Sequence, residues 1–206
     1  MRKTPLVEGE YYHIYNRGVD KRAIFENLTN LSRFFQSIEE FNVIKPIGSI
    51  FLNSFNKKAK NNGKLVEIIC YCLNPNHFHF ILRQLVENGI SEFMKRLSGG
   101  YTQYFNIQHK RNGVLFQGRF KSSHIDSDTY LRHVSAYINL NNRFHGEPYK
   151  LSKSSWDEYL GKERNCICNS KIVLEQFKSR KEYKKFAEDS LRDIVKRKEL
   201  EKDLEF

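Results

Sequence analysis

The chain has 206 residues, and its content of 39% hydrophobic and 14% aromatic residues is too high for an intrinsically disordered or collagen-like protein. Thirty-five Lys and Arg residues against 24 Asp and Glu residues give a net charge of +11, which favours a polyanionic partner, either a nucleic acid or an anionic membrane surface. No apolar stretch is long enough to span a bilayer and the first residues lack an apolar signal core, so we expect a cytoplasmic protein that does not insert into a membrane.

The first half of the chain predicts three strands and one helix. Residues 10–17 alternate polar and bulky side chains before Gly18, which is typical of a strand that enters a turn. Apolar residues at helical spacing predict a helix from Thr29 to about Val43, with Asn27 or Thr29 as its N-cap. Two further strands, residues 65–73 and 77–82, flank a break at Asn74-Pro75-Asn76 and can pair as neighbours.

Polar and basic residues 52–64 precede these two strands. They end at Asn61-Asn62-Gly63, which has the composition of a tight turn, and the segment therefore predicts a surface loop or hairpin tip.

The second half adds two helices and a strand. A helix is expected from about Ile90 to Gln108, although Gly99-Gly100 interrupts it and indicates a kink or a close backbone approach. Residues 114–123 predict a strand, and Asp126-Ser-Asp128 caps a helix that runs to about Asn141.

The order strand, helix, strand, strand, helix, strand predicts an α+β fold, a ferredoxin-like split βαβ sandwich with an antiparallel sheet. Beyond Pro148 the composition changes to a loop around Trp156 and then to a charged helical stretch from Lys171 onwards. We therefore expect a main domain at residues 1–150 and a C-terminal helical extension at residues 151–206.

His77-Phe78-His79 is the clearest candidate for a metal site. Residues two apart on a strand share one face, so both imidazoles can reach a single ion while Phe78 packs on the other side. A chain with seven histidines can contain one His-x-His pair by chance, so the motif is only weakly specific for a metal site. Taken alone, such a pair is more often structural than metal-binding.

Tyr137 and Asn141 form a second candidate pair. They are four residues apart in the predicted helix, which places a phenol beside an amide oxygen that can bind a hard cation. The alternative is a core tyrosine followed by an asparagine that ends the helix, and spacing alone favours that alternative.

A basic segment lies between these two pairs. Residues 91–124 contain one acid, Glu92, and aromatic residues are interleaved with the cations, a mixture that is typical of proteins that bind single-stranded nucleic acid. The alternative is a solvated basic face over an ordinary aromatic core. The cations are Lys95, Arg96, Lys110, Arg111, Arg119 and Lys121.

The cysteines and the remaining motifs argue against several other classes of protein. Cys70 and Cys72 lie in an apolar strand, and the spacing of both Cys-x-Cys pairs is shorter than structural zinc sites use. Four cysteines are too few for a disulfide scaffold. The sequence also lacks the glycine-rich phosphate loops and the nucleophile elbow of nucleotide-dependent enzymes and α/β-hydrolases.

Five segments in order resemble the successive motifs of REP-associated tyrosine transposases, which belong to the single-tyrosine HUH transposases. The resemblance covers roughly residues 8–145, and Trp156-Asp-Glu-Tyr159 resembles a later motif of the family. The five segments are Tyr11-Tyr-His-Ile-Tyr-Asn-Arg17-Gly18, Tyr71-Cys-Leu-Asn-Pro-Asn-His77-Phe-His79, Tyr101-Thr-Gln-Tyr-Phe-Asn106, Leu115-Phe-Gln-Gly-Arg-Phe-Lys-Ser122 and Tyr137-Ile-Asn-Leu-Asn141.

The resemblance implies metal-dependent cleavage and rejoining of single-stranded DNA at hairpin-associated sites, through a 5′-phosphotyrosine intermediate. Tyr137 would be the nucleophile, and His77, His79 and Asn141 would bind Mg²⁺ or Mn²⁺. Arg17 and Arg143, with the cations of the basic segment, would position DNA phosphates.

The sequence departs from the family pattern at several positions and leaves alternatives open. Asn142 stands where a proline is usual, Asn74 where methionine is common, and residues 44–64 have the character of an insertion. A protein of the same fold that binds a DNA or RNA hairpin without cutting it is the main alternative, and a metal-dependent hydrolase that uses water is another. The sequence also does not decide between a monomer and a homodimer.

Overall fold

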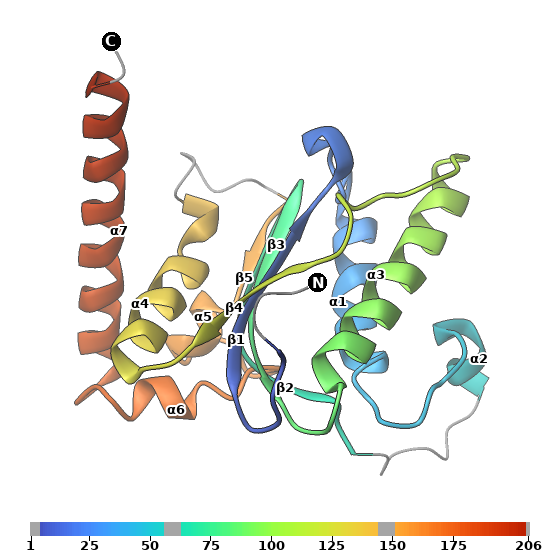
Figure 1. Cartoon of the computed structure of the whole chain (residues 1–206), viewed down its shortest axis with the longest axis horizontal. Coiled ribbons are helices and arrows are strands. Elements are labelled where there is room, and N and C mark those ends of the chain that lie inside the picture. Colours follow the sequence, from blue (N-terminus) through green and yellow to red (C-terminus); the bar gives the residue numbers. More distant parts are fainter. Residues whose placement is uncertain (1–4, 56–62, 144–150, 205–206) are drawn as a thin grey trace.

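The computed structural model describes residues 5–55, 63–143 and 151–204, and places helices on both faces of a five-stranded sheet (Figure 1). The strands are β1 (Tyr11–Arg17), β2 (Val66–Asn74), β3 (His77–Gln84), β4 (Lys121–Ile125) and β5 (Lys153–Ser154). The α-helices are α1 (Leu28–Glu40), α2 (Ile50–Phe55), α3 (Gly89–Gln108), α4 (Asp128–Asn139), α5 (Trp156–Tyr159), α6 (Lys171–Leu174) and α7 (Arg180–Leu204). Two 3-10 turns, η1 (Val19–Lys21) and η2 (Asn141–Arg143), complete the described elements.

The strands lie in the order β4-β1-β3-β2-β5, and each strand is antiparallel to its neighbours. The first four strands in chain order therefore make the β4-β1-β3-β2 arrangement of a split βαβ fold. This confirms the predicted α+β, ferredoxin-like sandwich. The helical C-terminal part is also present, and β5 of that part extends the sheet beside β2.

Two apolar cores form, one on each face of the sheet. Helices α1 and α3 cover one face, where Phe34, Phe78 and Tyr101 are fully buried (Figure 1). Helices α4 and α7 lie on the other face, where Ile81, Ile138 and Tyr183 are fully buried (Figure 1). Alternation along each strand decides which side chains meet which core.

Helices α1 and α3 lie where helices were predicted, but the end of α1 and the course of α3 at its two glycines differ from the prediction. Helix α1 begins after Asn27, whose side chain accepts a hydrogen bond of 2.8 Å from the Asn30 amide, and it ends before Val43. Helix α3 continues through Gly99 and Gly100, so the predicted interruption is wrong. The predicted close approach is found at Gly100, where a Cβ atom would lie 2.7 Å from the ring of Phe41.

Other boundaries differ from the predictions. The strand expected at residues 114–123 begins only at Lys121, because Leu115 and Phe116 are buried as part of a loop in which Gly113 and Gly118 have φ of 85° and 66°. Helix α4 ends at Asn139, so that Asn141 lies in η2 instead of in the helix.

Helix α2 occupies part of the expected surface loop at residues 52–64, and Asn61 and Asn62 of the predicted turn lie outside the described residues. The predicted boundary at residue 150 also lies outside them. None of the helices in the described part of the chain is long and apolar enough to span a membrane.

Candidate active site

The two histidines of the His77-Phe78-His79 motif face the α4 side of the sheet. Phe78 between them is fully buried against the opposite core, with its ring centroid 5.5 Å from that of Phe34. Strand β1 lies beside β3 in a register that pairs Tyr15 with His79 and Arg17 with His77. The sheet therefore presents these four side chains on one surface.

Helix α4 brings Tyr137 to this surface. The Tyr137 ring centroid lies 5.7 Å from that of His79 and 6.4 Å from that of His13. The helix starts where Ser127 accepts a hydrogen bond from the Tyr130 amide, and its apolar face, with Val134 and Ile138, packs into the core. Two elements far apart in the sequence thus place a phenol beside the histidine pair.

Asn141 joins His77 directly, even though it lies just beyond the helix. Its Oδ1 atom lies 3.1 Å from His77 Nε2, and both atoms lie within hydrogen-bond distance of the Asn74 Nδ2 atom, at 2.7 and 3.0 Å respectively. Asn74 and Asn141 are both buried. The structure thus brings together the sequence-predicted set of His77, His79, Tyr137 and Asn141 and adds Asn74 to it.

Each histidine of the motif has a hydrogen-bond partner at Nδ1, and the Nε2 atom of His77 faces Asn74 and Asn141. His77 Nδ1 lies 2.6 Å from Asn76 Oδ1, and His79 Nδ1 lies 2.9 Å from His13 Nε2. An Nδ1–H group that donates to such an acceptor leaves Nε2 as the lone-pair nitrogen, the form in which imidazole binds metals.

His13 is the functional residue that the sequence analysis missed. Its ring stacks on His79 with centroids 5.1 Å apart, and burial lowers its pKa to about 4, so it is neutral at physiological pH and can accept the His79 hydrogen bond. The available signal was the alternation of strand residues 11–17, which places His13 on the same face as Tyr15 and Arg17.

The donor set fits a small divalent cation. Neighbouring ligands of an octahedral ion with bonds of about 2.1 Å lie about 3.0 Å apart, and His77 Nε2 and Asn141 Oδ1 have this separation. No group of three His, Cys, Asp or Glu side chains suited to a metal occurs in the described ranges, so amide oxygens are needed beside the imidazoles. Amide oxygens suit Mg²⁺ and Mn²⁺, whereas the imidazoles also suit borderline metals such as Zn²⁺ and Fe²⁺.

The environment of Tyr137 opposes its ionisation. Burial raises the pKa of the Tyr137 phenol above its ordinary value of 10, and the neighbouring Cys72 and Tyr15 act in the same direction. A hydrogen bond with the Asn141 side chain acts against this rise. The phenol is therefore protonated at neutral pH, and a nearby positive charge would favour its ionised form.

A cavity of about 430 Å³ opens beside the histidine motif. Three cations line it, Arg17, Lys21 and Lys121, and Arg17 Nε is held by Gln117 Oε1. Tyr15 also lines the cavity and stacks on His79 with centroids 5.7 Å apart. Positive charges and an aromatic face around one cavity suit a phosphate and the base next to it.

The other predicted DNA-binding cations do not line this cavity. Arg96 donates hydrogen bonds to the Val43 and Ile44 carbonyl oxygens, and the exposed Lys95 lies 3.7 Å from Glu92. The Arg143 guanidinium lies over the Trp156 ring, at 5.5 Å, and Arg119 is exposed in the loop before β4.

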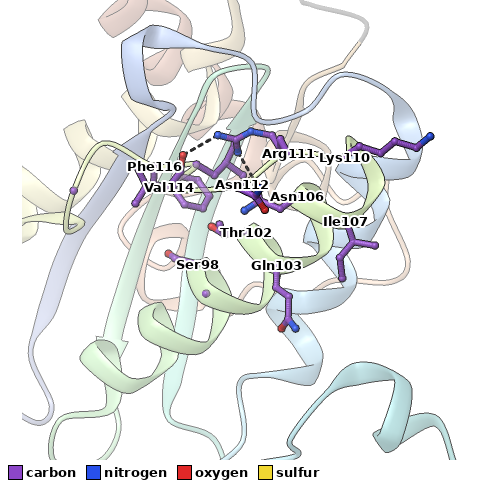
Figure 2. A pocket seen from close by; sticks show the side chains of 13 residues that line it. Ser98, Thr102, Gln103, Asn106, Ile107, Lys110, Arg111, Asn112, Val114 and Phe116 are labelled. Carbon is purple, nitrogen blue, oxygen red and sulfur yellow. Dashed lines mark hydrogen bonds between the residues drawn. The ribbon is translucent and has the colours of Figure 1, made fainter.

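Lys110 and Arg111 border a separate groove of about 790 Å³ between α3 and the following loop (Figure 2). Arg111 bonds to Asn106 Oδ1 and to the Val114 carbonyl oxygen, at 2.8 and 2.9 Å, and so holds that loop against the helix (Figure 2). These contacts indicate that Arg111 supports the loop, in contrast to the predicted role in binding DNA phosphates.

Comparisons with known proteins agree with this fold. The family model described as "Transposase IS200 like" matches residues 9–141. The structure entitled "Structure of the REP associates tyrosine transposase bound to a REP hairpin" is similar to this chain with a TM-score of 0.57 and 15% identity, over 84% of this chain and 92% of that one. No curated protein matches the sequence.

Proposed function

The chain belongs to the IS200-like transposase family, and on that premise we propose that it cleaves and rejoins single-stranded DNA at hairpin-associated sites through a phosphotyrosine intermediate. Family membership supports a DNA-processing, transposase-type enzyme. Tyr137 is the proposed nucleophile, and His77, His79 and Asn141 are the proposed ligands of Mg²⁺ or Mn²⁺. The hairpin substrate is proposed because a protein of similar fold was solved with a REP hairpin.

The observation that carries the proposal is the position of Tyr137. Its ring lies 5.7 Å from that of His79, and the Asn141 side chain, which acts to lower the pKa of the Tyr137 phenol, contacts His77. A protein that only binds DNA needs neither a tyrosine nor two histidines in this arrangement. A nucleophile beside a donor set for a divalent ion is the arrangement that transesterification needs.

In the proposed reaction, the Tyr137 oxygen attacks the scissile phosphorus and the 3′-oxygen leaves. The products are a 5′-phosphotyrosine bond and a free 3′-hydroxyl: the phenol proton passes to solvent, and the leaving 3′-oxygen takes up a proton from solvent. Another 3′-hydroxyl reverses the step, because the phosphotyrosine ester retains the diester bond energy. When bound, the divalent ion supplies positive charge that favours the phenolate and the charge developing on the phosphate. Arg17 and Lys121 hold neighbouring phosphates at the cavity.

The first test mixes the protein with labelled single-stranded hairpins from the DNA beside its own gene, with Mn²⁺ or Mg²⁺. Transfer of label to the protein in a denaturing gel is the expected result. Tyr137→Phe and a chelator should each abolish that transfer. Tyr130→Phe, on an exposed part of the same helix, is the matched control and should leave it unchanged.

Two outcomes would contradict the proposal. Tight hairpin binding without cleavage under any metal would indicate a binding module of the same fold. Cleavage that survives Tyr137→Phe, without a covalent adduct, would indicate a hydrolase that uses water.

A further inference from the structure

Three polar atoms at the proposed metal site form a small triangle. His77 Nε2, Asn141 Oδ1 and Asn74 Nδ2 are separated by 2.7, 3.0 and 3.1 Å. Three mutually adjacent ligands of an octahedral ion with bonds of about 2.1 Å form a triangle with edges of about 3.0 Å. The Asn74 side chain thus stands where a third ligand of such an ion would lie.

The Asn74 amide as oriented satisfies these neighbours through hydrogen bonds. Its Nδ2 group donates to Asn141 Oδ1 and faces the lone pair of His77 Nε2. Rotation of the amide by half a turn exchanges Nδ2 and Oδ1, which have nearly the same size. Three acceptors would then converge on one point, an arrangement that is unfavourable unless a cation lies between them.

The surroundings of Asn74 permit this rotation. Its Oδ1 atom accepts a hydrogen bond from Cys72 Sγ at a distance of 3.7 Å. A thiol sulfur is a weak donor and also a weak acceptor, so it can face either end of the amide. Asn74 is fully buried in β2, and this keeps either end of the amide close to His77 and Asn141.

We propose that Asn74 Oδ1 is a further ligand of the divalent ion, beside His77, His79 and Asn141. The inference rests on the metal site of the proposed function. An amide oxygen is a good ligand for hard cations, whereas a thioether such as that of methionine is a poor one. The amide makes the site of this chain more oxygen-rich and better suited to Mg²⁺ or Mn²⁺.

The test measures Mn²⁺ affinity on the full-length protein from the electron paramagnetic resonance signal of free Mn²⁺. Asn74→Met should weaken binding about tenfold or more, an effect as large as the loss of supporting groups around metal sites. Asn74→Asp keeps an oxygen at the same place and should bind at least as tightly as the natural chain. Thermal unfolding in chelator checks that each variant folds.

Unchanged or tighter Mn²⁺ binding by Asn74→Met would overturn the inference. Tighter binding would mean that the Asn74 N–H groups only compete with the metal for His77 and Asn141. His77→Ala separates this failure from a failure of the proposed function. If the natural chain and His77→Ala both bind no Mn²⁺, the metal site itself is wrong, and the ligand role of Asn74 falls with it.

A second readout needs no variant that might misfold. In ¹⁵N–¹H spectra, Mg²⁺ should shift the side-chain amide signals of Asn74, because its N–H groups leave His77 and Asn141. Asn74 signals that stay unchanged while the ring signals of His77 move would overturn the ligand role.

Discussion

His13 lies at the Nδ1 atom of His79, a residue of the proposed metal site. Its Nε2 lies 2.9 Å from His79 Nδ1, and burial lowers its pKa, so the neutral His13 ring can accept a hydrogen bond from His79 Nδ1–H. An imidazole with its proton on Nδ1 presents the Nε2 lone pair to the metal. If His79 binds a metal as proposed, His13 would be a positioning residue that acts through His79.

We expect His13→Ala to lower Mn²⁺ affinity about 10- to 100-fold, as is typical when a partner of a metal-binding histidine is removed. His13→Gln retains an acceptor and should lose less. Isothermal titration of both variants, with unfolding curves in chelator as the folding control, checks this. Equal affinity of His13→Ala and the natural chain would show that the contact with His79 only supports packing.

Tyr137 sets the expected pH dependence of the reaction. Because burial raises the pKa of its phenol, the reactive phenolate is a small fraction at neutral pH, and this fraction grows with pH. We expect the single-turnover rate of adduct formation to rise with pH, about tenfold per unit while the pH lies well below that pKa. A rate that is constant over the same range would mean that ionisation of Tyr137 does not limit the chemical step.

At the scale of elements, the two adjacent glycines of α3 have different roles. A Cβ atom on Gly100 would lie 2.7 Å from the buried ring of Phe41, whereas one on Gly99 would meet no atom within 4 Å. Gly100 therefore permits α3 to pack closely on the segment that follows α1. Gly99 has no such packing role.

This difference predicts opposite effects of the same substitution. Gly100→Ala should lower the free energy of unfolding by about 1–3 kcal/mol, because the helix and Phe41 must move apart. Gly99→Ala should raise it by up to about 1 kcal/mol through helix propensity alone. Urea unfolding of the two variants measures both values, and destabilisation of equal size would refute the packing argument.

Several elements were predictable because their signals are local. Alternation in β1 and β3 and the apolar face of α1 are visible in short windows of sequence. Strand β5 gave no such signal, because it has two residues and pairs with β2 across a long sequence separation. Similarly, Leu115 and Phe116 are apolar whether they lie in a strand or, as here, anchor a loop.

The same distinction holds within the candidate site. His77 and His79 are recognisable from their spacing on one strand. His13 and Asn74 are not, because their roles depend on the pairing of β1 and β2 with β3, which spacing within one segment does not reveal. Of the predicted DNA-binding cations, Arg17 and Lys121 line the cavity, whereas Arg96 and Arg111 bond to backbone carbonyl groups.

At the scale of the whole molecule, the C-terminal part completes the core under α4. The buried Tyr183 of α7 accepts a hydrogen bond of 2.8 Å from Asn139 Nδ2, and its hydroxyl lies 3.2 Å from Ser135 Oγ. Both partners belong to α4, the helix that carries Tyr137. Helix α7 therefore stabilises the position of the proposed nucleophile.

Tyr183→Phe should lower the free energy of unfolding by about 1–3 kcal/mol, because it leaves the buried Asn139 amide without its acceptor. Tyr130→Phe removes a hydroxyl from an exposed side chain of α4 and should change stability by less than about 0.5 kcal/mol. Chemical denaturation compares the two. Equal effects would mean that the hydroxyl of Tyr183 does not join α7 to α4.

The contribution of the C-terminal part to this core matters when a copy of such a gene in a genome is classified as intact or damaged. The family model ends at residue 141, yet Trp156, Tyr159 and Tyr183 supply buried side chains to the core beneath Tyr137. A copy with a frameshift after codon 145 would still encode every residue of the proposed active site. It would encode only part of the scaffold that holds them, so the integrity of the downstream reading frame is the better criterion for an intact gene.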